Sequence, residues 1–167
     1  MRYALTIVFV FFLTVIQTTL IRSVEIFNVI PNLLLVAVIC YSLCKGDWKA
    51  LVFGVVCGLV LDFTGGRVVG VNTLLCTYAA FLCYLLHGGL FNNNVFVAAV
   101  FVLIISFVYE FLFYMMQFFI WGETDIAFAL LHKILPGALY NAVAAVPVYP
   151  IMRRLSESTA TRQRVKW

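Results

Sequence analysis

Charged side chains are scarce in this 167-residue chain, so those inside its apolar runs are the first candidates for chemistry. Glu110 and Lys133 lie in two separate apolar runs, and a charge in lipid usually faces the interior of a helix bundle. If the runs are antiparallel helices, the two charges differ in depth by only about 5 Å, which a lysine side chain can span. We therefore predict a Glu110–Lys133 ion pair that holds two helices together. A proton or ion relay is the alternative, but it would need more than one carboxylate.

A second acidic residue ends a stripe of small residues. Ala50, Gly54, Gly58 and Asp62 are spaced four residues apart and therefore lie on one face of a helix. Small residues at this spacing let two helix backbones approach closely in lipid, where packing drives helix association. The stripe is predicted either to receive the helix of a partner protein or to pack inside the protein's own bundle.

Asp62 also precedes a bend that is rich in glycine. Gly65-Gly66 and Gly70 follow it, and glycine adopts the backbone conformations that tight bends require. We expect Asp62 to cap this bend or to pair with Arg67 or Arg22. A role as a substrate-binding acid is the alternative.

Patterns typical of catalysis or metal binding are not indicated. The sequence shows no nucleophile–base pair and no phosphate-binding loop, and neither histidine has a second His or Cys at ligand spacing. The five cysteines lie inside apolar runs, where a thiol packs as a small hydrophobic group. We therefore predict no catalytic residue, no cofactor and no metal site, and a protein that is not an enzyme.

The composition places these residues in a membrane. Hydrophobic residues make up 65% of the chain and charged residues 11%, whereas a soluble domain is roughly half apolar and about a quarter charged. A soluble fold of this size could not bury so much apolar surface, so lipid must cover part of it. This excludes a soluble enzyme, a disordered segment and a nucleic-acid-binding module, despite the net charge of +4.

Six apolar runs predict an all-α, polytopic fold, a six-helix transmembrane bundle. A helix needs roughly 20 apolar residues to cross a hydrocarbon core of about 30 Å. The whole chain, 1–167, is predicted to form a single membrane domain, and its first run to be a retained helix rather than a cleaved signal peptide. The predicted spans are 3–21, 27–44, 50–63, 68–86, 95–121 and 126–152, followed by a basic tail over 153–167.

The positions of lysine and arginine predict the orientation. With the N-terminus inside, eight cations fall on the cytoplasmic side and two on the opposite side, which follows the positive-inside rule. We therefore expect a multi-pass protein of the bacterial inner membrane with both termini in the cytoplasm. If the third run were only a re-entrant loop, everything after it would be reversed and the tail would lie outside.

Residues 31–72 carry a series of motifs in a fixed order. Pro31-Asn32 precedes three leucines; the stripe Gly54, Gly58 and Asp62 follows, and then the glycine-rich bend that ends at Gly70. This series resembles the MreD family of rod shape-determining membrane proteins. Asn32 stands where that family often has Asp, which puts any role for an acid at this position in doubt.

The resemblance implies a component of the machinery that makes side-wall peptidoglycan during cell elongation. It implies binding to the single-span protein MreC. Through MreC it implies a larger complex with MreB filaments, the polymerase RodA and a penicillin-binding transpeptidase. Membrane lipids are expected partners and nucleic acid is not. The family is also similar in fold to the S components of energy-coupling vitamin transporters, which are six-helix bundles.

Two functions follow as alternatives. The first is a non-enzymatic scaffold; the second is a small-molecule-binding, S component-like subunit of an energy-coupling transporter. The second would use a polar pocket near the outer face, lined by Asp62, Asn72, Glu110 and Asn141. S components dock through an Ala-x-x-x-Ala patch on the first helix, where this chain has only Thr14-x-x-x-Thr18, and this favours the scaffold. A proton-coupled transporter ranks last, because no inverted repeat is found.

Overall fold

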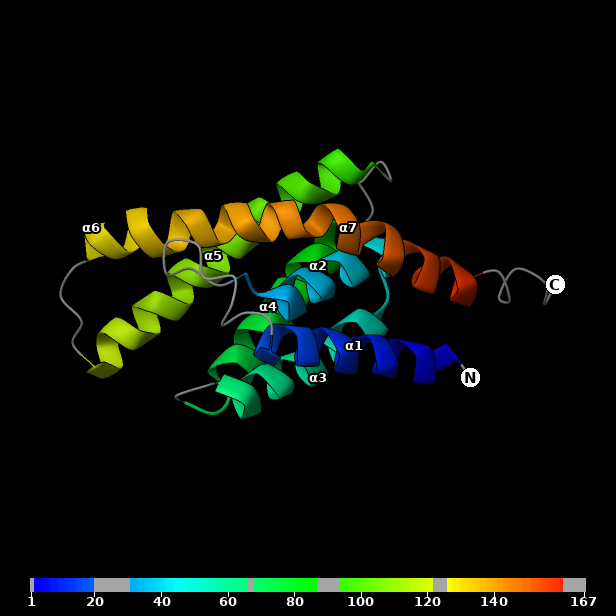
Figure 1. Ribbon diagram of the computed structural model, residues 1–167, viewed down its shortest axis with the longest axis horizontal. Helices are drawn as coiled ribbons and strands as arrows, with labels where there is room; N and C mark the ends of the chain where they lie inside the picture. The colour runs from blue at the N-terminus through cyan, green and yellow to red at the C-terminus, as the bar shows by residue number, and fades with distance from the viewer. Residues whose placement is uncertain (1, 20–30, 66–67, 87–93, 122–125, 161–167) are drawn as a thin grey trace.

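The computed structural model describes residues 2–19, 31–65, 68–86, 94–121 and 126–160, and all regular secondary structure in this part is helical (Figure 1). A π-helical turn, Leu130–Ile134, joins α6 to α7, so the last elements form one continuous rod and the bundle has six rods. The predicted all-α, six-helix class is confirmed. The helices are α1 (Arg2–Thr19), α2 (Leu33–Lys45), α3 (Trp48–Gly65), α4 (Val71–Leu86), α5 (Val95–Trp121), α6 (Ile126–Ala129) and α7 (Leu135–Ala160).

Within the part of the chain that the structure describes, three stretches of helix are long and apolar enough to cross a membrane. They are Trp48–Gly65, Val95–Ile120 and Leu130–Arg154. In contrast, α2 has 13 residues and α4 has 16, so at ~1.5 Å per residue they are about 20 and 24 Å long, shorter than a hydrocarbon core of about 30 Å. At least one end of each short helix therefore lies within the hydrocarbon core, and the unpaired backbone N–H or C=O groups at that end must be satisfied by other parts of the protein.

The centre of the bundle is α2. Its ten residues from Leu34 to Leu43 are all buried, and α1, α3, α4, α5 and α7 pack around it. A helix that is buried on every side is apolar on every side, which explains why this segment shows no polar face. The predicted span 27–44 included Pro31 and Asn32; instead, both precede the helix, because α2 begins at Leu33.

The rods alternate in direction. α2 and α7 run parallel, because Asn32 and Asn141 meet near their starts and Cys44 lies near Tyr149 further along both helices. The start of α1 and the end of α7 lie at the same end of the bundle (Figure 1). At the opposite end, α5 and the α6–α7 rod extend beyond the other four helices.

Candidate functional site

The small-residue stripe on α3 packs directly against α4. A Cβ atom added to Gly58 would lie 2.4 Å from Cα of Thr73, and one added to Gly54 would lie 2.9 Å from Cβ of Ala80. Real Cβ atoms do not approach other atoms so closely, so only glycine permits this distance between the two helices. The small-residue face of α3 is therefore covered by α4. Of the two predicted roles, receiving a partner helix or packing inside the bundle, the structure shows packing inside the bundle.

Asp62 lies one helical turn beyond Gly58 and caps α4. Its carboxylate accepts hydrogen bonds from the backbone N–H groups of Gly70 (2.9 Å), Asn72 (3.1 Å) and Thr73 (3.0 Å), and from Oγ of Thr73 (2.5 Å). Asp62 is only 3% exposed, so it replaces the water that would otherwise satisfy the first N–H groups of the helix. Arg67 and Arg22, which we considered as ion-pair partners, lie outside the described residues.

Gly70 makes the geometry of this cap possible. Its φ is +102°, in a region that residues with a side chain rarely adopt. The turn aims the backbone N–H of Gly70 at Asp62 and starts α4 alongside α3. The close helix contact, the acid and the glycine turn thus act together to close the α3–α4 hairpin.

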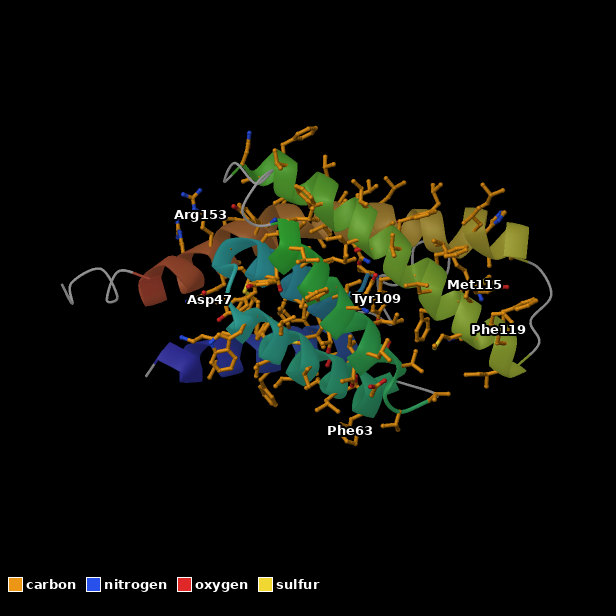
Figure 2. The ribbon with its side chains drawn as sticks, turned by 180° about the vertical axis from the view of Figure 1, so that it is seen from behind. Asp47, Phe63, Tyr109, Met115, Phe119 and Arg153 are labelled. Carbon is orange, nitrogen blue, oxygen red and sulfur yellow. The ribbon has the colours of Figure 1, made fainter. Side chains whose placement is uncertain are left out.

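The cap is linked to α5 through a further hydrogen bond. The hydroxyl of Tyr109 donates to Oδ1 of Asn72 at 2.6 Å, and both side chains are buried. Tyr109 lies in the middle of the molecule (Figure 2). The sequence does not mark Tyr109, since an aromatic residue in an apolar run has no spacing that identifies its hydroxyl as a bonded group.

A second capped helix start belongs to α2. Asn32 is its N-cap, and its Oδ1 accepts from the backbone N–H of Leu35 at 3.1 Å. Asn141 on α7 accepts from the N–H of Asn32 at 2.8 Å, and Gln17 on α1 accepts from that of Leu34 at 3.2 Å. The amide of Asn32 thus supplies the acceptor that an N-cap requires without a charge. Gln17 is a further residue that the sequence did not mark.

Glu110 and Lys133 are not brought together: among the described residues the structure contains no ion pair between them, and Lys133 is exposed. The physical reason is the π-helical turn at Leu130–Ile134. Buried residues on this rod are five apart from Ala129 to Ile134 and four apart from Ile134 to Ala138, so the inward face passes through Ile134. Its neighbour Lys133 is consequently turned off that face.

Three of the four polar residues of the predicted pocket, Asp62, Asn72 and Asn141, are used in the structure of the bundle. Asp62 accepts hydrogen bonds from the start of α4, and Asn72 accepts one from the hydroxyl of Tyr109. Oδ1 of Asn141 accepts one from the backbone N–H of Asn32, at the start of α2. Within the described residues, no three His, Cys, Asp or Glu side chains form a group that could hold a metal ion. The arrangement is suited to fixing helices in place.

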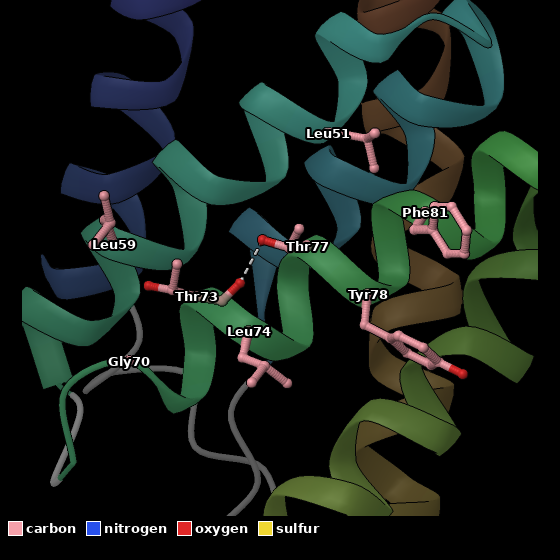
Figure 3. Close-up of a pocket in the computed structure, with 8 residues that line it drawn as sticks. All are labelled: Leu51, Leu59, Gly70, Thr73, Leu74, Thr77, Tyr78 and Phe81. Carbon is pink, nitrogen blue, oxygen red and sulfur yellow. Dashed lines mark hydrogen bonds between the residues drawn. The ribbon is translucent and has the colours of Figure 1, made fainter.

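The side of the α3–α4 hairpin that faces away from the bundle carries a shallow apolar groove of about 590 Å³ (Figure 3). The hydroxyls of Thr73 and Thr77, which line it, are bonded within the hairpin: Thr73 donates to Asp62, and Thr77 donates to the carbonyl of Thr73 at 2.7 Å. With these hydroxyls satisfied, the groove is suited to packing against another apolar surface. Its lining residues are Leu51, Leu59, Gly70, Thr73, Leu74, Thr77, Tyr78 and Phe81.

Comparison with known proteins identifies one family. A family model described as rod shape-determining protein MreD matches residues 1–159, which is nearly the whole chain. No curated protein and no solved structure matches it. The family match extends far beyond the motifs at 31–72 that carry the resemblance in the sequence.

Proposed function

Because the chain belongs to the MreD family of rod shape-determining proteins, we propose that it is a non-enzymatic scaffold of the cell-elongation machinery in the inner membrane. Membership makes it a membrane protein of the rod-shape system. Its proposed task is to bind the membrane helix of MreC and so help to position side-wall peptidoglycan synthesis. MreB filaments, RodA and a penicillin-binding transpeptidase are the further members of the proposed complex.

The observation that supports this function best is the groove on the outer side of the α3–α4 hairpin. The stripe of Gly54 and Gly58 is occupied by α4, so a partner helix could reach it only by separating the hairpin. The groove is open, and Gly70, Thr73 and Thr77 provide small residues along its length. Small residues let the backbone of a transmembrane helix approach closely and gain dispersion contacts.

The hairpin is also a rigid support for such a contact. Its two helices touch at Gly58 and are joined, where α3 ends and α4 begins, by the four hydrogen bonds of Asp62. A helix held in the groove would keep a constant angle and depth relative to the bundle. In this way MreC would be fixed laterally, with cytoplasmic filaments on one side of the membrane and wall synthesis on the other.

Leu74→Trp tests the groove, because Leu74 lines it and is 60% exposed. The larger ring should block a partner helix while leaving the α3–α4 contact intact. We expect recovery of MreC with the affinity-purified protein to fall about tenfold, equivalent to a loss of roughly 1.4 kcal/mol. Leu139→Trp is the matched control, since Leu139 is 50% exposed on α7, away from the groove.

Equal loss of MreC in both variants, or full recovery with Leu74→Trp, would contradict the proposed contact. ATP-binding-cassette subunits in the eluate in place of MreC would instead favour the energy-coupling transporter. Gly54→Leu and Gly58→Leu should also lose MreC, but they would do so by forcing α3 and α4 apart. They therefore test the hairpin and not the groove.

A further inference from the structure

One end of the bundle gathers basic side chains from three helices. Lys45 ends α2, Lys49 lies in the first turn of α3, and Arg153 and Arg154 lie near the end of α7. We call this group of four residues the basic end. Figure 2 shows Arg153 on this side of the molecule, at the opposite side from the end of α5.

Two features of the fold bring these cations together. Gly46, with φ of 55°, lets the chain turn from α2 into α3 within two residues, so the charges of Lys45 and Lys49 repel each other across the turn. Cys44 lies near Tyr149 on the parallel helix α7. Lys45 directly follows Cys44, and Arg153 lies one turn beyond Tyr149, so both cations lie at the same end of the bundle.

The positive charge of this end exceeds the acidic charge available to it. Asp47 is the only acid at this end whose side chain the structure describes, and it is exposed. The chain that follows, 153–167, carries five cations and a single acid in its sequence. Like charges placed so close together in a half-buried position are stabilised by an external anion.

We propose that the basic end binds the phosphate headgroup of an anionic phospholipid. Trp48, at the start of α3 between the two lysines in sequence, is 66% exposed. An exposed indole at the end of an apolar helix is typical of the headgroup region of a bilayer. This places the cations at the depth of lipid phosphates, where each contributes to attraction toward an anionic lipid. A lipid therefore fits this end better than an acidic protein segment does.

Trp48 provides a local reporter for the test. In a Trp121→Phe, Trp167→Phe background it is the only tryptophan, and lipids with brominated chains quench it when they bind beside it. The protein is reconstituted into vesicles of phosphatidylcholine that contain increasing amounts of brominated phosphatidylglycerol. We expect phosphatidylglycerol to be preferred at Trp48 by about 25-fold, and each lysine removed to lower this preference by about fivefold. Lys45→Gln/Lys49→Gln should therefore abolish it, whereas Lys45→Arg/Lys49→Arg should retain it.

The matched control keeps Trp121 and replaces Trp48 and Trp167 by Phe. Trp121 ends α5 at the opposite end of the bundle and should report no preference. Added salt should weaken the preference at Trp48 in the chain with both lysines present, since it screens exposed charges. Equal preference at Trp48 and Trp121, no effect of salt, or an unchanged value in Lys45→Gln/Lys49→Gln would overturn the proposal.

Discussion

At the scale of single residues, Asp62 shows how hydrogen bonds can hold an acid in an apolar bundle. Its carboxylate accepts four hydrogen bonds from the start of α4, three of them from backbone N–H groups that have no partner within the helix. The positive end of the helix dipole favours the negative charge at the same place. The acid therefore ties two helices together because it satisfies groups that lipid cannot satisfy.

Replacing this carboxylate should destabilise the protein strongly. Asp62→Ala leaves several buried donors without an acceptor, so we expect a loss of at least about 3 kcal/mol in unfolding free energy. The measurement is the thermal unfolding midpoint of the detergent-purified protein. Asp47→Ala removes an exposed acid and should leave the midpoint nearly unchanged. A similar small shift in both variants would show that the cap contributes little.

At the scale of elements, the α3–α4 hairpin depends on the distance between two backbones. Gly58 allows α3 to contact α4 at Thr73, and this contact brings Asp62, one turn later, within reach of the start of α4. Close packing and capping are thus coupled. A change that separates the helices should also lengthen the hydrogen bonds of the cap.

Three glycine-to-alanine variants test this coupling. Gly58→Ala places a methyl group against backbone atoms, so we expect a loss of about 3 kcal/mol or more. Gly54→Ala meets mainly a side-chain methyl at 2.9 Å and should cost less. Gly65→Ala has open space around the added group and serves as the control. Unfolding midpoints should fall in the order Gly65→Ala, Gly54→Ala, Gly58→Ala; equal midpoints for Gly58→Ala and Gly65→Ala would be incompatible with a tight seam.

At the scale of the whole molecule, helices of unequal length share one bundle. α5 has 27 residues, about 40 Å, whereas α2 is about 20 Å long. The short helix α2 is surrounded by the other helices, and the starts of α2 and α4 are capped by side chains from α1, α3 and α7. Side chains of the bundle therefore satisfy N–H groups at the starts of both short helices, which lipid could not satisfy.

The arrangement of the rods also agrees with the expected orientation. The start of α1 and the end of α7 lie at the same end of the bundle, and the basic end lies there too. By the positive-inside rule, this end should face the cytoplasm. In intact spheroplasts, a C-terminal epitope tag should resist added protease until the cells are lysed, while a tag inserted at 122–125 should be cleaved. Cleavage of the C-terminal tag in intact spheroplasts would reverse the assigned orientation.

The sequence by itself determined the class of the protein. Its composition and six apolar runs predict an all-α membrane bundle, and the ordered motifs from Pro31 to Gly70 point to the MreD family, which the match over 1–159 confirms. Helical periodicity also placed Gly54, Gly58 and Asp62 on one face. These are local properties, because composition and spacing along a helix do not depend on what packs against it.

Only the tertiary structure decided which surfaces meet. Periodicity cannot choose between α4 and a partner helix for the stripe, nor find the bond between Asn32 and Asn141, which are 109 residues apart. The prediction for Lys133 assumed a regular α-helix, and the π-helical turn rotated that residue away from the bundle. The groove is lined by residues of both α3 and α4, so it is a property of the pair of helices and of neither helix alone.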